Sequence, residues 1–445
     1  MQFKKTRLLL WLLLTIPYVF TYFHRVALNV IADQLMADFA LSATVLGNLA
    51  AIYAYMYLVM QIPGGALVDR LGPRRIASAC TFLLGCGSLV FASSTTSFML
   101  FTGRFLVGLG GSILLINIFK FQSNWFEENE FGTMTGIALL IGNLGAIFAS
   151  RPLAYAAENF SWQIAFMTIG FLSIIIALIS HLTIKDTPAA ADFVLKKKDN
   201  PKTAKNAASP PVNGAILALR NPHIWPPFFI NFGVYGSFMA FSATWGVPYL
   251  MQVYSLTREH ASTLMLLAAL GMMFGSPAIG FLSDYLLKRK MPVYSMLILY
   301  CLIWIMLLAW PGGKLPLVLL YPLNLLLGFG AAAIVPINAY AKEISHPAIT
   351  GSGTATANMG SFLGIAVVQS LFGYLLDLNW TGLSINGVKY YPLEAYRLGL
   401  LLCLVCSLLS LSMTVFLKET NGENIYYRLL KEQKTDGKSK AYPSN

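Results

Sequence analysis

The chain has 445 residues, of which 56% are hydrophobic and 11% are charged, and its mean hydropathy is +0.64. Such a composition leaves too few polar side chains to cover a soluble globular protein of this size, so it predicts a surface that largely meets lipid. The net charge of +12 would suit a nucleic-acid partner, but the basic residues lie between apolar segments without an aromatic stacking pattern, so no nucleic acid is expected. The five cysteines lie in apolar segments without other metal ligands nearby, so we expect no metal and no cofactor.

The apolar segments predict an all-α membrane protein with twelve transmembrane helices, because each is long enough, at about 18 residues or more, to cross a bilayer. In the N-terminal half we expect spans at 8–32, 43–67, 76–95, 98–122, 131–154 and 162–184. In the C-terminal half we expect them at 223–252, 260–285, 292–311, 316–342, 350–376 and 396–418. The first apolar segment follows basic residues as a secretion signal would, but no small-residue cleavage site comes after it, so we interpret it as a retained helix.

A polar segment at 185–222 divides the spans into two sets of six. It contains Lys196-Lys197-Lys198 and Ser209-Pro210-Pro211, a composition typical of a flexible linker. We therefore predict an N-terminal bundle at 1–184, a cytoplasmic linker at 185–222, a C-terminal bundle at 223–418 and a cytoplasmic tail at 419–445. Because Lys and Arg concentrate in the termini, the linker and the loops on the same side, we expect both termini in the cytoplasm and the protein in a bacterial inner membrane.

Three arginines lie within predicted spans, where a cation at the bilayer centre costs on the order of 3 kcal/mol. Arg25, inside the segment Tyr22–Asn29, offers a planar fork that can bind a carboxylate or phosphate; a side chain that extends to the outer interface is the alternative. For Arg104 we favour hydrogen bonds to backbone carbonyls over contact with a substrate. For Arg151 we slightly prefer interface anchoring to the attraction of anions into an outer mouth.

A short pattern occurs twice, each time directly after a long apolar segment, at Gly65–Arg75 and at Gly280–Lys290. Each copy joins a Gly that lets helix ends pack closely, an Asp that can pair with a neighbouring helix N-terminus, and a basic cluster that holds the loop on the cytoplasmic side. The repetition indicates a duplicated membrane transporter. We expect a role in conformational gating for residues of these copies and of helix 4, namely Asp69, Arg70, Arg74, Arg104 and Asp284.

The two copies resemble the loop after helix 2 of the major facilitator superfamily and its weaker echo after helix 8. Arg104 lies in a segment similar to the Arg-bearing helix 4 motif of that family. The segment from His24-Arg25 to Gln61–Arg70 resembles its organic anion symporter branch, of the galactonate and vesicular glutamate type. The resemblance implies two pseudo-symmetric six-helix bundles around a central cavity. It also implies that Arg25 binds the carboxylate of the substrate, with Tyr22 and Asn29 of the same segment as further substrate-binding candidates.

The same resemblance places helices 4, 7 and 10 beside this cavity. Lys120 aligns with a basic position of the branch and Asn117 lies on the same helix face, so both are candidates to bind an anion; a positive-inside anchor is an equally good explanation of Lys120. Asn231, Tyr235 and Asn338 could hydrogen-bond the polar body of a substrate. For any single Asn, a hydrogen bond between helices is the more common role.

Two positions depart from the branch. Its helix 1 Asp, which takes part in proton coupling, is His24 here, and its proton-binding helix 4 Glu corresponds to Gly111. Because no Asp or Glu falls at the centre of a predicted span, His24 remains the candidate for proton coupling. A neutral, hydrogen-bonded helix residue is the alternative.

The sequence therefore predicts a monomeric secondary transporter that takes up a small organic anion, such as a carboxylate, together with protons by alternating access. Export of a drug, siderophore or metabolite is one alternative, and a transporter-like membrane receptor is an alternative of another class. The sequence has no phosphate-binding Gly loop, nucleophile elbow or metal cluster, so it gives no support to ATP-driven transport or to an enzyme.

Overall fold

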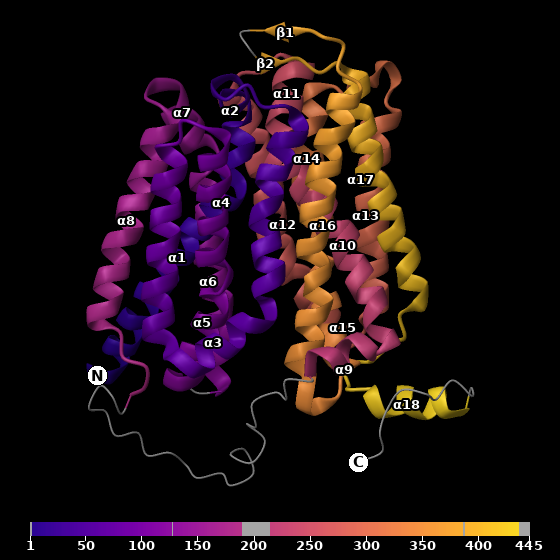
Figure 1. Cartoon of the computed structure of the whole chain (residues 1–445). Coiled ribbons are helices and arrows are strands. Elements are labelled where there is room, and N and C mark those ends of the chain that lie inside the picture. The colour runs from indigo at the N-terminus through magenta and orange to yellow at the C-terminus, as the bar shows by residue number, and fades with distance from the viewer. Residues whose placement is uncertain (1, 127, 189–213, 386–387, 436–445) are drawn as a thin grey trace.

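The computed structural model describes residues 2–126, 128–188, 214–385 and 388–435. Most of the predicted linker, at 189–213, and the end of the predicted tail, at 436–445, lie outside the described residues. The described chain begins and ends on the same side of the molecule, which we call the termini side (Figure 1).

The N-terminal half is a helical bundle (indigo to magenta in Figure 1). Its elements are α1 (Gln2–Val30), α2 (Ala32–Asp38), α3 (Ala43–Ala92), α4 (Ser97–Ser112), α5 (Leu114–Trp125), α6 (Glu128–Phe148), α7 (Arg151–Asn159) and α8 (Trp162–Thr183). The second and third predicted spans both lie within α3, where the non-helical backbone of Gly72, with φ of 79°, breaks the helix between them. Only glycine adopts this backbone conformation at little cost, and the Asp186 carboxylate accepts the Arg74 backbone N–H at 2.7 Å just after this break.

The C-terminal half is a second helical bundle beside the first (pink to yellow in Figure 1). It contains α9 (Gly214–Arg220), η2 (Pro222–Ile224), α10 (Trp225–Ala240), η3 (Phe241–Trp245), α11 (Gly246–Tyr254), α12 (Arg258–Tyr285), α13 (Lys290–Ala309), η4 (Pro311–Gly313), α14 (Leu317–Ala331), α15 (Ile334–Glu343), η5 (Pro347–Ile349), α16 (Thr350–Leu378), α17 (Leu393–Met413), η6 (Thr414–Phe416) and α18 (Tyr426–Thr435). A two-stranded antiparallel hairpin, β1 (Ser384–Ile385) with β2 (Val388–Lys389), lies on the side opposite the termini. The sequence reasoning did not predict this hairpin.

Eleven segments of the described chain are long and apolar enough to cross a membrane. The remaining predicted span, 223–252, is present as α10 and α11, but the π-helical turn η3 interrupts it, so neither helix alone has the length of a full crossing. In a π turn the backbone hydrogen bonds join residues five apart instead of four, and such turns are often found at functional positions.

Small residues let the helices within each half approach closely. A Cβ atom added to Gly328 of α14 would lie 1.9 Å from the carbonyl oxygen of Ala268 in α12, so this pair of helices packs backbone against backbone. Close packing through small residues is the usual basis of helix association in lipid, where the hydrophobic effect does not drive helices together. The two halves contact each other chiefly through α3 with α16 and through α1 with η3.

Candidate functional site

A cavity of about 1810 Å³ lies between the two bundles. It is larger than the roughly 300–1,000 Å³ of typical small-molecule sites, as expected of a vestibule that continues to the surface. Its lining runs from Arg25 of α1 to Asp69 and Arg70 of α3 and to Lys342 of α15. These last three residues are exposed, so the cavity opens on the termini side.

Arg25 lies at the inner end of the cavity among tyrosines. Its guanidinium carbon is 4.6 Å from the ring centroid of Tyr22 and 5.2 Å from that of Tyr57, and Nη1 donates to the hydroxyl of Tyr235 at 3.4 Å. The side chain is 9% exposed, its Nε has no hydrogen-bond partner, and no described carboxylate forms an ion pair with it. Cation–π contacts offset only part of the cost of burying this charge, so Arg25 is a buried cation without a described counter-charge.

Arg104 and His24 lie behind this site, inside the N-terminal bundle. The Arg104 Nη1 donates to the His24 carbonyl oxygen at 2.7 Å, and its guanidinium carbon lies 5.3 Å from the ring centroid of Tyr53. This agrees with the interpretation of Arg104 as a residue that holds helices together. The His24 ring packs on Phe166 with ring centroids 5.3 Å apart, and neither ring nitrogen has a hydrogen-bond partner. The structure does not bring His24 to the cavity lining, and it does not show the hydrogen-bonded histidine of the alternative interpretation either.

The predicted amides divide into two groups. Asn29, Asn117 and Asn231 are at most 1% exposed and do not line the cavity. Asn117 donates to the Pro73 carbonyl oxygen at 3.1 Å, and Asn231 donates to the Ala357 carbonyl oxygen at 3.0 Å and to Asn338 at 3.2 Å. Asn338 does line the cavity, as do Tyr22 and Tyr235. For Asn117 and Asn231 the structure therefore supports hydrogen bonding between helices, because their amides donate to carbonyl oxygens of other helices and do not line the cavity.

On the termini side, the charged groups of the repeated pattern pair within their own halves. Asp69 accepts a hydrogen bond from the ammonium of Lys120 at 2.6 Å, and Arg74 donates from Nε to the His181 carbonyl oxygen at 2.7 Å. Lys120 itself is not among the residues that line the cavity, so it lies beside its mouth. Because these pairs do not reach across to the C-terminal half, they leave the termini side open.

The charged residues of the second copy of the pattern also pair within one half of the protein. Arg289 binds Asp284 at 2.5 Å and Glu343 at 2.7 Å, all within the C-terminal half. The hydrogen bond with Glu343, followed by that with Asp284, raises the pKa of Arg289 despite partial burial. Glu419 accepts the backbone N–H of Arg289 at 2.6 Å, so the chain after α17 is fastened to the same cluster. Asp284 thus anchors a loop of its own half in this conformation.

On the opposite side, polar contacts join the two halves. The Asn29 side chain donates to the Ser242 carbonyl oxygen at 2.6 Å and accepts the Val247 backbone N–H at 2.8 Å. Ser242 lies within the π turn η3 and Val247 follows it in α11, so one amide bridges α1 to the interrupted span. Asn29 therefore holds the cavity shut on this side, a role that differs from the substrate binding predicted for it.

Three further contacts join the two halves on this side: two ion pairs, and one carboxylate that accepts a backbone N–H. Arg258 of α12 binds Asp33 of α2 at 2.6 Å, with Arg258 9% and Asp33 24% exposed. Asp377 of α16 accepts the backbone N–H of Thr44 at 2.7 Å, at the start of α3. Arg151 binds Glu259 at 2.6 Å on the surface, so its charge is paired with a carboxylate of the other half. The molecule is therefore open to the termini side and closed to the other.

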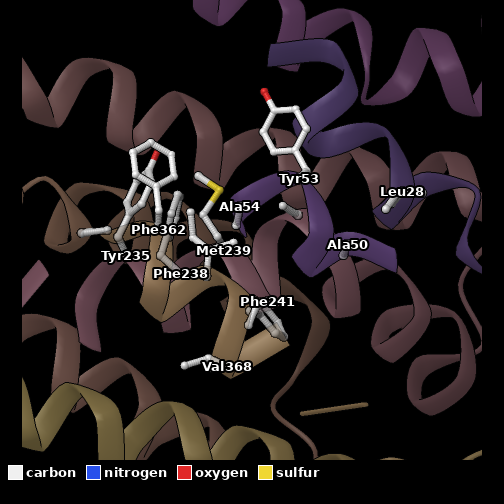
Figure 2. Close-up of a cluster of buried hydrophobic side chains, with 14 of the residues drawn as sticks. Leu28, Ala50, Tyr53, Ala54, Tyr235, Phe238, Met239, Phe241, Phe362 and Val368 are labelled. Carbon is white, nitrogen blue, oxygen red and sulfur yellow. The ribbon is translucent and has the colours of Figure 1, made fainter. Parts of the chain in front are cut away.

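Several of these residues were not singled out from the sequence. Tyr53 and Tyr57 lie one helical turn apart, and that spacing on an apolar helix was a usable signal for a shared face toward Arg25. The Asp33–Arg258 pair joins residues 225 positions apart, and nothing local in the sequence links them. Figure 2 shows Tyr53 on α3 and the side chains of Tyr235, Phe238, Met239 and Phe362 gathered across from it.

Residues 14–369 match the model of the Major Facilitator Superfamily. The chain belongs to this superfamily. Its members are membrane transporters rather than enzymes, so a small-molecule substrate follows from membership, and the predicted fold of paired helical bundles is confirmed.

Among relatives, a hexuronate transporter of Bacillus subtilis is 25% identical over 290 residues, covering 65% of this chain and 67% of the relative. A probable galactarate/D-glucarate transporter, GudP, of the same organism is 24% identical over 314 residues, covering 63% and 67%. The chain thus spans about two thirds of the length of these relatives. A solved bacterial homologue of the human lysosomal transporter Spinster, in an inward-facing and unoccupied conformation, has a TM-score of 0.71 and 18% identity over 92% of this chain and 96% of that one, which shows the fold.

The Asn29 bridge can be tested without a substrate. We expect Asn29→Ala to raise the hydrogen-exchange rate of the Val247 amide at least about tenfold, because a buried backbone donor loses its partner. Hydrogen–deuterium exchange followed by mass spectrometry of the α10–α11 region measures this. Asn324→Ala is the matched control, because the Asn324 amide donates to Leu320 of its own helix. Equal protection of the α10–α11 region in both variants would show that Asn29 does not hold the two halves together.

Proposed function

We propose that this transporter carries a small organic anion, with Arg25 as the residue that binds its acidic group. The observation that carries the proposal is the buried guanidinium of Arg25, which lines the cavity and forms no ion pair with a described carboxylate. A guanidinium presents two parallel N–H groups to a carboxylate, and such charge-assisted pairs are strong where water is scarce. The names of the relatives, which refer to hexuronate and to galactarate or D-glucarate, support the same substrate class.

The proposed transport mechanism is alternating access about the Arg25 site. Contacts on the side opposite the termini, such as Asp33–Arg258 and Asn29–Ser242, would separate as the halves rock. At the same time Asp69, now paired with Lys120, would be available to the other half as the termini side closes. An anion on Arg25 lowers the cost of enclosing that cation, so binding favours the closed intermediate.

Proton coupling, uptake as the direction, a monomeric state, a bacterial inner membrane and cytoplasmic termini stay predictions. Among the described residues that line the cavity, Asp69 alone is a carboxylate, and it lies at the mouth in an ion pair. His24 is buried away from this lining, so its geometry gives little support to the predicted proton role.

The decisive experiment is transport by the purified protein in liposomes. We expect a labelled monocarboxylate to accumulate by counterflow in liposomes with the parent protein and to stay at background with Arg25→Gln. A pH-sensitive dye inside the liposomes reports whether protons enter with the anion. Binding without flux would identify a receptor, and flux that is equal in the Arg25→Gln variant would overturn the anion-binding role of Arg25.

A further inference from the structure

The polar groups on the cavity wall beside Arg25 are tyrosine hydroxyls, those of Tyr22, Tyr57 and Tyr235. Of the amides expected to bind the polar body of a substrate, Asn338 lines the cavity, whereas Asn29 and Asn231 are held in hydrogen bonds to backbone carbonyls of other helices. The Ser242 hydroxyl lines the cavity but donates to the Phe238 carbonyl oxygen of its own helix at 2.7 Å. A polyhydroxylated acid needs many partners, because each buried hydroxyl without one costs free energy.

Aromatic rings and thioethers occupy this wall instead. The Phe362 ring of α16 stacks on Tyr57 of α3, with centroids 4.9 Å apart and an interplanar angle of 27°. Tyr235 and Phe238 form a second stacked pair one turn apart on α10, with Met239 beside them (Figure 2). All five side chains line the cavity. Thioether side chains also adapt to the shape of an apolar ligand.

The opposite wall, on α12, continues this apolar character. Met265, Met272 and Met273 line the cavity there, so thioethers face the aromatic cluster from the other side. A ligand between these walls would exchange water for rings and methyl groups on both faces, which favours an apolar body.

The charge of the site fits one acidic group. Among the described lining residues, Arg25 is the cation at the inner end, whereas Arg70 and Lys342 lie exposed at the termini-side mouth. A single guanidinium pairs with a single carboxylate, and a second carboxylate at this depth would be buried without a partner.

Building on the proposed function, we propose that the cargo is a monocarboxylate whose body is aromatic or otherwise apolar. The carboxylate binds Arg25 and displaces the long hydrogen bond from Arg25 to Tyr235. The apolar body packs between the Phe362–Tyr57 stack and the methionines of α12. This substrate class differs from the sugar acids in the names of the relatives.

The test compares two monocarboxylates, 3-phenylpropionate and D-gluconate, by thermal-shift titration of the full-length detergent-purified protein. We expect 3-phenylpropionate to bind at least about tenfold more tightly, as burial of part of a phenyl ring predicts. The neutral 3-phenylpropanamide should not bind measurably, because it lacks the charge. Arg25→Gln should abolish the binding of both acids.

Phe362→Ser tests the apolar wall directly and should weaken 3-phenylpropionate several-fold while leaving gluconate unchanged. Phe171→Ser is the matched control, because Phe171 is exposed on α8 outside the cavity lining. Gluconate bound as tightly as 3-phenylpropionate, with Arg25 still required, would overturn the apolar cargo and leave the proposed function intact. If Phe362→Ser loses affinity for 3-phenylpropionate no more than Phe171→Ser does, the proposed packing of the apolar body against Phe362 is wrong. If neither acid binds in an Arg25-dependent way, both proposals are wrong.

Discussion

Replacing Arg25 by Gln is expected to weaken binding of the proposed anionic substrate by about a hundredfold or more, because two charge-assisted hydrogen bonds are lost together. Arg25→Lys keeps the positive charge but loses the planar pair of N–H donors, so we expect an intermediate, about tenfold, loss of affinity. The same substitutions should not lower the melting temperature of the empty protein. A buried cation without a carboxylate opposes folding, so its removal leaves the empty protein at least as stable.

Isothermal titration and thermal unfolding of the same preparations measure these two effects separately. Arg397→Gln is a suitable control, because Arg397 is an exposed arginine that donates to the Leu308 carbonyl oxygen and does not line the cavity. A fall in melting temperature that matches the loss of binding would show that Arg25 acts mainly on the fold. Unchanged affinity in Arg25→Gln with a stable protein would remove the anion site altogether.

Breaking the Asp33–Arg258 pair is expected to shift the transporter towards the conformation that opens opposite the termini. In Asp33→Asn, Arg258 remains 9% exposed without its counter-charge, which destabilises the closed side by about 3 kcal/mol and favours its opening by about a hundredfold. Thr95 and Lys314 are exposed in loops of the two halves on this side. With spin labels at these two positions, double electron–electron resonance should report a longer distance between the labels.

The charge swap Asp33→Arg with Arg258→Asp is the control for this effect. It restores an ion pair between α2 and α12 and should return the label distance towards that of the parent. Arg151→Gln breaks the exposed pair with Glu259 and should change the distribution of distances between the spin labels little, since surface ion pairs contribute about 1 kcal/mol or less. An Asp33→Asn distribution identical to the parent would show that this pair does not keep the side closed.

The architecture was accessible from local properties of the chain. Long apolar segments predict spans because lipid leaves no other way to satisfy backbone hydrogen bonds, and the two copies of the Gly–Asp–basic pattern indicate the duplication. The same reasoning could not foresee the π turn η3, which interrupts the seventh span. That turn is stabilised by Asn29, a residue more than 200 positions away in the other half.

What the sequence by itself determined is therefore the class of protein, the approximate spans and the intramembrane cation Arg25, because lipid imposes strict rules on each segment alone. Only the tertiary structure decided which polar residues face the cavity. Asn29, Asn117 and Asn231 are chemically suited to a substrate, yet their amides bind backbone groups of other helices. Whether an amide meets cargo or protein depends on helix rotation and on packing between distant segments, and these follow from all contacts of the bundle together.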